Sequence, residues 1–169
     1  MRYKILSLIA AVALVAACET AGEGGGSMAG GGAKPVETFT TPLGMIKPGS
    51  QEDLVVNVGD RVFFDFDKFN LKPDARKLIE KQAAWLKANP SVRVTIEGHC
   101  DERGTREYNL ALGERRANSA KDYLVSLGIN PGRLKTISYG KERPVAMGSN
   151  EAAWAQNRRS VTVVTGAGS

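Results

Sequence analysis

Apolar and polar positions alternate in several short stretches of the chain, and stretches of helical periodicity lie between them. A first helical stretch begins at Pro73 and ends at Asn89-Pro90, because proline fits the first turn of a helix and disfavours its continuation. A long one ends before Gly128, and a short one covers residues 151–157. Period-two alternation predicts strands at residues 62–67, 92–97, 134–139 and 160–165. Strands that alternate with helices predict an α/β (α+β) two-layer sandwich, with helices on one side of a sheet.

The N-terminal third of the chain follows a different pattern, which is typical of an exported and tethered protein. Two basic residues precede a short apolar run, which predicts a signal peptide at residues 1–17. The run is too short to span a bilayer, which takes about 20 apolar residues. Residues 18–54 are rich in glycine and proline and predict a flexible linker. We expect the folded domain at residues 55–165 and a short tail at residues 166–169.

The charge balance of the chain is too mild to indicate a nucleic-acid partner. The sequence has 23 basic and 18 acidic residues, a formal net charge of +5. Removal of the predicted signal peptide takes away Arg2 and Lys4 and no acidic residue, so 21 basic and 18 acidic residues remain, or +3. The chain also has no basic stripe interleaved with aromatic residues.

The junction between the second strand and the long helix gathers charged side chains of both signs. Asp101 lies in the turn, and Arg115 and Arg116 follow in the helix. Arg116 falls on the apolar stripe of that helix, four residues from Leu112 and four from Ala120. A guanidinium on a buried stripe keeps its charge and needs an anion, which is either Asp101 or a ligand carboxylate. We expect a site for a small zwitterionic ligand; the alternative is a purely structural ion pair between Asp101 and Arg116.

The neighbouring His99 and Cys100 do not favour an enzyme. Adjacent strand residues point to opposite faces of a sheet, so these side chains cannot form a nucleophile–base pair or a joint metal site. His99 is the only histidine, and we expect it to be packed in the core. We therefore expect no catalytic residue, no metal and no cofactor. The residues expected at or near the surface are the rim arginines Arg103 and Arg106, the strand-entry arginines Arg158 and Arg159, and a partly covered Trp85.

Several motifs, in order and at compatible spacing, resemble the OmpA-like peptidoglycan-binding domain. The motifs are Phe64-Asp65-Phe66-Asp67, Gly98-His99-Cys100-Asp101-Glu102-Arg103-Gly104-Thr105, Tyr108-Asn109, Leu112-Gly113-Glu114-Arg115-Arg116-Ala117, Ser138-Tyr139-Gly140 and Asn157-Arg158-Arg159. The run Gly-His-x-Asp-Glu-Arg-Gly-Thr, with Glu-Ala-Ala-Trp before Asn-Arg-Arg, is similar to the lipoprotein branch of the family that works in the Tol–Pal system. The resemblance covers about residues 55–165 and implies a βαβαβ-(α)β domain.

The resemblance also implies what the domain binds and with which residues. The implied ligand is the meso-diaminopimelate of the peptidoglycan peptide stem, which is bound and not cleaved. On the matching positions, Asp101 receives the ligand ammonium and Arg116 binds a carboxylate through a bidentate fork. Asn109 adds hydrogen bonds, and Phe66 and Asp67 form the opposite wall of the site.

The N-terminal segment and the family together imply a place in the cell envelope. Leu14-Val15-Ala16-Ala17-Cys18 resembles the bacterial lipobox, which implies lipid attachment at Cys18; ordinary cleavage after Ala-x-Ala is the alternative. Glu19, where an aspartate would signal inner-membrane retention, favours the outer membrane. The family implies a TolB-like periplasmic partner, other Tol components, and a tether between outer membrane and wall that supports constriction at division. The remaining alternatives are a scaffold that binds only a periplasmic protein and a cell-wall hydrolase that uses His99.

Overall fold

The computed structural model describes residues 46–167 of the chain. In chain order its elements are α1 (Gln51–Asp53), η1 (Leu54–Val58), β1 (Arg61–Phe63), α2 (Pro73–Ala88), β2 (Val92–His99), α3 (Arg106–Ser126), η2 (Pro131–Arg133), β3 (Leu134–Gly140), α4 (Glu151–Asn157) and β4 (Arg159–Ala167). The predicted signal peptide, Cys18 and most of the predicted linker lie outside the described residues. Among the helices described, none is long and apolar enough to cross a membrane.

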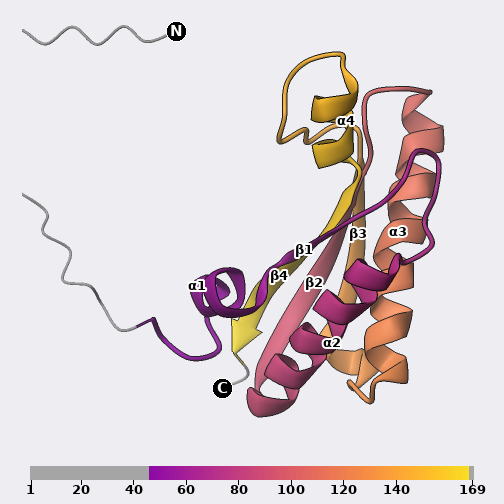
Figure 1. Cartoon of the computed structure of the whole chain (residues 1–169). Helices are drawn as coiled ribbons and strands as arrows, with labels where there is room; N and C mark the ends of the chain where they lie inside the picture. The colour runs from indigo at the N-terminus through magenta and orange to yellow at the C-terminus, as the bar shows by residue number, and fades with distance from the viewer. Residues whose placement is uncertain (1–45, 168–169) are drawn as a thin grey trace, which may run out of the picture. The chain divides into compact units, whose positions relative to one another are not determined.

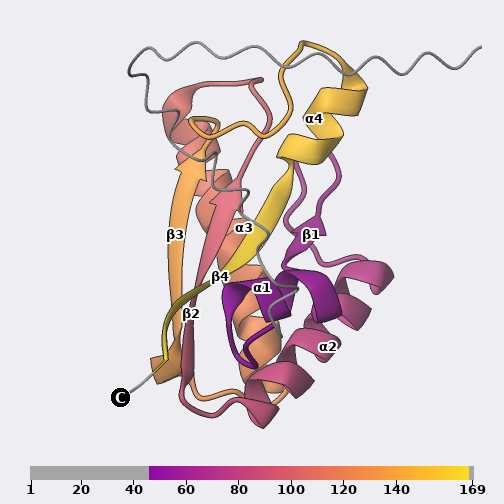
Figure 2. The ribbon, with the colours of Figure 1, turned by 90° about the vertical axis from the view of Figure 1, so that its left-hand side faces the viewer.

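The four described strands form one sheet in the order β1-β4-β2-β3 (Figure 1). β4 pairs antiparallel with both β1 and β2, and β2 pairs parallel with β3. α2 and α3 lie on one side of the sheet, and Figure 2 shows the opposite side, with the strands in front of α3. The predicted two-layer sandwich and its βαβαβ-(α)β order are therefore confirmed.

The hydrophobic core lies between the sheet and the two long helices. Its buried apolar side chains from β2, α2 and α3 are Val92, Val94, Ile96, Ala75, Ile79, Ala83, Leu86, Ala117, Ala120 and Leu124. Trp85 is more buried than predicted, with 9% of its surface exposed. Its indole N–H donates to Asp53 Oδ2 at 2.8 Å, so the unpredicted α1 covers it.

The first strand is shorter than the alternating pattern predicts. β1 ends at Phe63, whereas the pattern continues to Asp67. The chain turns there, because the Lys68 N–H donates to the Asp65 carbonyl at 3.1 Å and Asp67 has a positive φ of 55°. Aspartate tolerates this left-handed conformation better than most residues. The turn carries Phe66 and Asp67 out of the sheet and to the wall of the candidate site.

A short helical segment before β1, which the sequence pattern does not predict, also belongs to the fold. The Ser50 side chain accepts the Asp53 N–H at 3.1 Å and caps α1. Leu54, at the start of η1, is completely buried. The Val164 N–H of β4 donates to Gln51 Oε1 at 2.7 Å, which ties α1 to the sheet. The segment is too short for helical periodicity to show in the sequence, so tertiary contacts decide its conformation.

Two glycines let α3 approach the sheet closely. A Cβ atom on Gly98 of β2 would lie 1.8 Å from the Gly113 carbonyl oxygen of α3, and one on Gly113 would lie 2.3 Å from Ser138 Oγ of β3. The Thr105 side chain accepts the Tyr108 N–H at 3.2 Å and caps the helix. The first turns of α3 are thereby fixed against the ends of β2 and β3.

Candidate ligand-binding site

A cavity of about 270 Å³ opens at the N-terminal end of α3. Three segments form its wall: the turn after β1, the connection from β2 to α3, and the first turns of α3. All five residues that the sequence suggests for the ligand line this cavity. The lining consists of Phe66, Asp67, Cys100, Asp101, Arg103, Gly104, Tyr108, Asn109, Leu112 and Arg116.

Arg116 lines the cavity and is completely buried. Its Nε donates to the Lys68 carbonyl at 2.8 Å, Nη1 to the His99 carbonyl at 2.8 Å, and Nη2 to the Asp65 carbonyl at 3.1 Å. A guanidinium has five N–H donors, so two remain after these three bonds. Burial lowers the pKa of Arg116 from its usual value. None of the carboxylates in the described residues forms an ion pair with it: its three hydrogen bonds go to carbonyl oxygens, and the Asp101 and Asp67 carboxylates act on its charge only from a distance.

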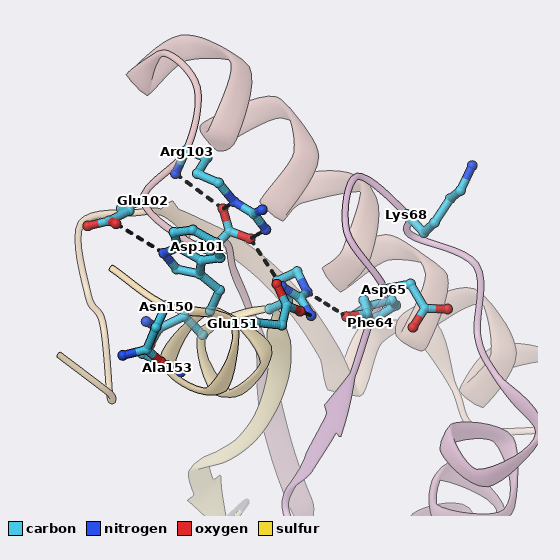
Figure 3. A network of polar contacts seen from close by, with 12 residues as sticks. Phe64, Asp65, Lys68, Asp101, Glu102, Arg103, Asn150, Glu151 and Ala153 are labelled. Carbon is cyan, nitrogen blue, oxygen red and sulfur yellow. Dashed lines mark hydrogen bonds and ion pairs between the residues drawn. The ribbon is translucent and has the colours of Figure 1, made fainter. Parts of the chain in front are cut away.

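Asp101 is the second buried charge of the cavity, and its ion partners are Arg103 and Arg158, not Arg116 as the structural alternative required. Arg103 Nη2 donates to Oδ2 at 2.6 Å and Arg103 Nε to Oδ1 at 3.2 Å, while Arg158 Nη1 lies 3.4 Å from Oδ2 (Figure 3). Burial acts to raise the pKa of Asp101, but the hydrogen bonds from the Arg103 side chain and backbone outweigh it, so this pKa lies below its usual value. A structural ion pair between Asp101 and Arg116 is therefore absent from the described residues.

Arg158 and Arg159, which the sequence suggests to be surface charges, are buried, with 6% and 4% of their surface exposed. Arg158 Nε donates to the Phe64 carbonyl at 3.1 Å and Nη2 to Glu151 Oε1 at 2.6 Å, in addition to its contact with Asp101. The surface prediction is wrong for Arg158 because these partners come from the β1 end, α4 and the β2–α3 connection, and for Arg159 because its guanidinium donates to the Asn157 and Arg143 carbonyls. Sequence spacing relates none of these segments to one another.

Arg103 is likewise more engaged than a residue on a solvated rim. Its side chain is 31% exposed, and its guanidinium carbon lies 4.1 Å from the centre of the Phe66 ring and 4.0 Å from that of Trp154. Arg106, the other predicted rim residue, is 66% exposed and pairs with Glu142 at 3.3 Å. The sequence gives no signal that separates these two arginines, since Phe66 and Trp154 are distant in the chain.

Asn109 fastens the β2–α3 connection to the helix. Its Nδ2 donates to the Arg103 carbonyl at 2.8 Å and to the Thr105 carbonyl at 3.0 Å. Its Oδ1 accepts from none of the described residues, so one acceptor remains for a ligand. On the opposite wall, the Asp67 carboxylate accepts the Tyr108 hydroxyl, and this bond raises the pKa of Tyr108. Sequence reasoning did not assign Tyr108 to the site, although it falls in one of the quoted motifs.

His99, the last residue of β2, and Cys100, which follows it, have different neighbours: His99 lies against Tyr139 and Glu97. The Cys100 thiol lines the cavity and donates to the Asn109 carbonyl at 3.3 Å, and burial raises its pKa to about 11. Burial and the charges of Arg159, Arg143 and Arg61 lower the pKa of His99 to about 4. Across the described residues, no group of three histidine, cysteine or acidic side chains is placed to hold a metal ion.

Comparison with known proteins defines the class to which this fold and this site belong. Residues 63–158 match the model of the OmpA family. The chain therefore belongs to the OmpA family.

Within that family the chain is similar to proteins named peptidoglycan-associated lipoprotein. It is 58% identical over 126 residues to the one from Rhizobium meliloti (strain 1021), which covers 75% of this chain and 72% of that protein. It is 41% identical over 157 residues to the one from Pseudomonas aeruginosa, with 92% of this chain and 93% of that protein covered. The family resemblance inferred from the motifs is confirmed.

Solved structures agree with this assignment. The crystal structure of the peptidoglycan-associated lipoprotein from Burkholderia pseudomallei matches with a TM-score of 0.61 and 43% identity, over 63% of this chain and 90% of that one. The C-terminal domain of Helicobacter pylori MotB matches with a TM-score of 0.57 at 24% identity, which shows a shared fold alone. The cited curated relatives are named as lipoproteins and residues 63–158 match the OmpA family, which agrees with the prediction of a non-enzymatic protein.

Proposed function

We propose that this protein binds the meso-diaminopimelate group of the peptidoglycan peptide stem without cleaving it. The proposal rests mainly on the state of Arg116. Its guanidinium is completely buried, lines the cavity and has no carboxylate partner among the described residues. A buried cation without an anion favours a ligand that brings a carboxylate. The two free N–H groups of Arg116 suit a bidentate contact with that carboxylate.

The other lining residues complement the remaining groups of such a ligand. Asp101 and Asp67 offer carboxylates for an ammonium group, and Asn109 Oδ1 offers a further acceptor. The exposed ring of Phe66 covers one side of the opening. Diaminopimelate carries an ammonium and a carboxylate on one carbon, so it matches a site that holds both signs of charge at short range. A dicarboxylate or a simple amine would satisfy only half of these residues.

We further propose that the protein holds the outer membrane of a Gram-negative cell to its wall. Cys18 is the proposed lipid attachment site, the residues between it and α1 are the proposed linker, and the domain from α1 to β4 is proposed to lie in the periplasm. Two attachments on one chain raise the effective concentration of each for its partner, so a weak wall contact is sufficient. The names of the relatives support wall association. A TolB-like protein and other Tol components are proposed partners, with a role in envelope integrity and constriction at division.

The test is co-sedimentation of the full chain, in detergent, with purified cell wall freed of protein. We expect Arg116→Lys and Asp101→Asn to weaken retention about tenfold or more, because each removes a charge-assisted hydrogen bond to the ligand. The free diaminopimelate tripeptide of the stem should release the unmodified protein. Arg106→Ala, an exposed arginine in a surface ion pair, is the matched control and should leave retention unchanged.

Three other results would contradict the proposal. Full retention of both site variants would place the wall contact elsewhere. A protein that binds only a periplasmic partner would not sediment with protein-free wall at all. Soluble wall fragments in the supernatant would indicate a hydrolase. Thermal unfolding followed by circular dichroism checks that the variants remain folded.

A further inference from the structure

Every acceptor position of the Asp101 carboxylate is already used within the protein. Oδ1 accepts the backbone N–H of Arg103 at 3.2 Å and Arg103 Nε at 3.2 Å. Oδ2 accepts Arg103 Nη2 at 2.6 Å and Arg158 Nη1 at 3.4 Å. An ionised carboxylate has about four lone-pair sites, so these four donors fill it. A ligand ammonium can therefore bind Asp101 only if one of the two guanidiniums leaves.

The two guanidiniums differ in how firmly they are held. Arg158 is buried and also donates to the carbonyl of buried Phe64 and to Glu151, so its departure would cost a buried hydrogen bond to the Phe64 carbonyl. Within residues 46–167, the side-chain hydrogen bonds of Arg103 go to Asp101 alone (Figure 3). This side chain is 31% exposed. Water can hydrate the Arg103 guanidinium as soon as it swings outward. Arg103 is therefore the cation that leaves.

The aromatic faces around Arg103 favour a cation, whether the Arg103 guanidinium or a ligand ammonium lies between them. Phe66 comes from the turn after β1 and Trp154 from α4, and the guanidinium of Arg103 lies between the two rings at 4.1 and 4.0 Å. The Trp154 indole is held by Glu102 Oε1, to which its N–H donates at 3.0 Å. Ring faces attract an ammonium group as they attract a guanidinium. The space between these rings, once Arg103 leaves, can receive the ammonium end of a ligand.

We propose that Arg103 is a displaceable counter-ion of Asp101, which the ligand ammonium must replace before the wall peptide is bound. This inference rests on the proposed function of the same site. It has two consequences. Only molecules in which Arg103 has left Asp101 can bind the wall peptide. The apparent affinity for the wall therefore falls as the fraction of molecules with Arg103 on Asp101 rises. Ligands without an ammonium group cannot displace Arg103, so it also acts as a specificity-determining residue against plain carboxylates.

The test is a calorimetric titration of the full chain, in detergent, with the tripeptide L-Ala–γ-D-Glu–meso-diaminopimelate. Arg103→Ala should bind about three- to tenfold more tightly than the unmodified protein, the range expected for loss of a partly exposed ion pair that competes with the ligand. Arg103→Gln, which keeps the stacked side chain but not the charge, should also bind more tightly. Arg106→Ala removes the same charge three residues away and should not change the affinity.

Tryptophan fluorescence gives a second measurement. If Arg103 had only a structural role, ligand binding would not change the emission of Trp154. In a Trp85→Phe background, Trp154 is the remaining tryptophan of the chain. Its emission should shift on tripeptide binding as Arg103 leaves the ring. In Arg103→Ala the emission should start near the bound-state value and change less.

The outcomes separate this inference from the proposed function. Weaker or equal tripeptide affinity in both Arg103 variants, with binding still lost in Arg116→Lys and Asp101→Asn, overturns the counter-ion role and leaves the proposed function standing. Unchanged affinity in Arg116→Lys and Asp101→Asn overturns both. Tighter binding in Arg103→Ala and Arg103→Gln, with Arg106→Ala unchanged, supports both.

Discussion

At the scale of single residues, this protein is defined by ionisable side chains that it buries. Arg116, Asp101, Arg158 and His99 all lie below the surface near the end of β2. Carbonyl oxygens accept the hydrogen bonds of Arg116, the Arg103 guanidinium bonds to Asp101 and lowers its pKa, and burial together with neighbouring cations lowers the pKa of His99. These environments concentrate charge at the cavity, and they make the stability of the fold depend on pH.

His99 gives a prediction about that dependence. Its pKa is about 4 in the folded chain, against about 6.5 when unfolded, even though Glu97 Oε2 lies 3.4 Å from Nε2. Between these values the unfolded chain binds a proton that the folded chain does not, so stability falls as the pH drops through this window. Replacing His99 by phenylalanine should reduce the loss between about pH 7 and pH 4.5 by roughly 2–3 kcal/mol.

Urea unfolding at both pH values, for the unmodified protein and for His99→Phe, measures the difference. The His99 and Tyr139 ring centres are 5.5 Å apart, and phenylalanine at position 99 keeps an aromatic ring in this contact. Both proteins carry the same carboxylates, so the difference between their pH profiles isolates the change at position 99. Parallel pH profiles for the two proteins would mean that His99 does not carry this dependence.

At the scale of secondary structure elements, the site depends on how closely α3 approaches β2 and β3. Arg116 and Asn109 project from α3, while Asp101 follows β2, so the distance between helix and sheet sets the width of the cavity. Gly98 and Gly113 make that approach possible, because a side chain on either would meet atoms of the facing element. α4 adds Glu151 and Trp154 to the same end of the sheet.

Gly98→Ala should therefore destabilise the fold and weaken the site. The new methyl group would lie 1.8 Å from the Gly113 carbonyl oxygen, a backbone atom that cannot rotate away. We expect a loss of about 3 kcal/mol or more in the free energy of unfolding, together with weaker tripeptide binding as α3 moves outward. Gly166→Ala in β4, where a Cβ meets nothing within 4 Å, should change stability by less than about 0.5 kcal/mol. Equal midpoints of denaturation for the two variants would contradict this account.

At the scale of the whole molecule, the proposed function needs two attachments on one chain. The described residues carry the proposed wall-binding end, and the proposed lipid at Cys18 is the other. The domain contributes its cavity at one end of the sheet and leaves the side opposite α3 uncovered by any described helix other than α1 and η1 (Figure 2). The two ends can be tested separately, because different residues carry them.

Cys18→Ser should abolish incorporation of a fatty-acid label and release the protein from the outer-membrane fraction of a Gram-negative host. The reason is chemical, since only a thiol at this position can form the thioether to the lipid. Cys100→Ser is the matched control and should keep the label, because the Cys100 thiol is buried in the domain. Retention of the label in Cys18→Ser would show that the anchor lies elsewhere. Binding of the tripeptide should be the same in the Cys18 variant and the unmodified chain.

The sequence alone determined the order of strands and helices and the segment that carries the site. Alternation and helical periodicity are local properties, and they placed β2, α2, α3, β3, α4 and β4 within a few residues of their observed ends. Capping and breaking residues such as Pro73 and Gly128 are equally local. The same local motifs brought attention to Asp101, Asn109, Arg116, Phe66 and Asp67, which the structure places around one cavity.

Only the tertiary structure decided which charges meet. Asp101 contacts Arg158, which is 57 residues away, and Arg116 contacts carbonyls 48 and 51 residues away. Asp101, one of the two anions that the sequence suggested for Arg116, is instead held by Arg103. No periodicity relates such distant residues, because packing of the sheet against α3 and α4 sets their separation. The same applies to α1 and η1, which are too short to form without the domain beneath them. Local pattern fixes the elements, and the free energy of burying them together selects the partners of each charge.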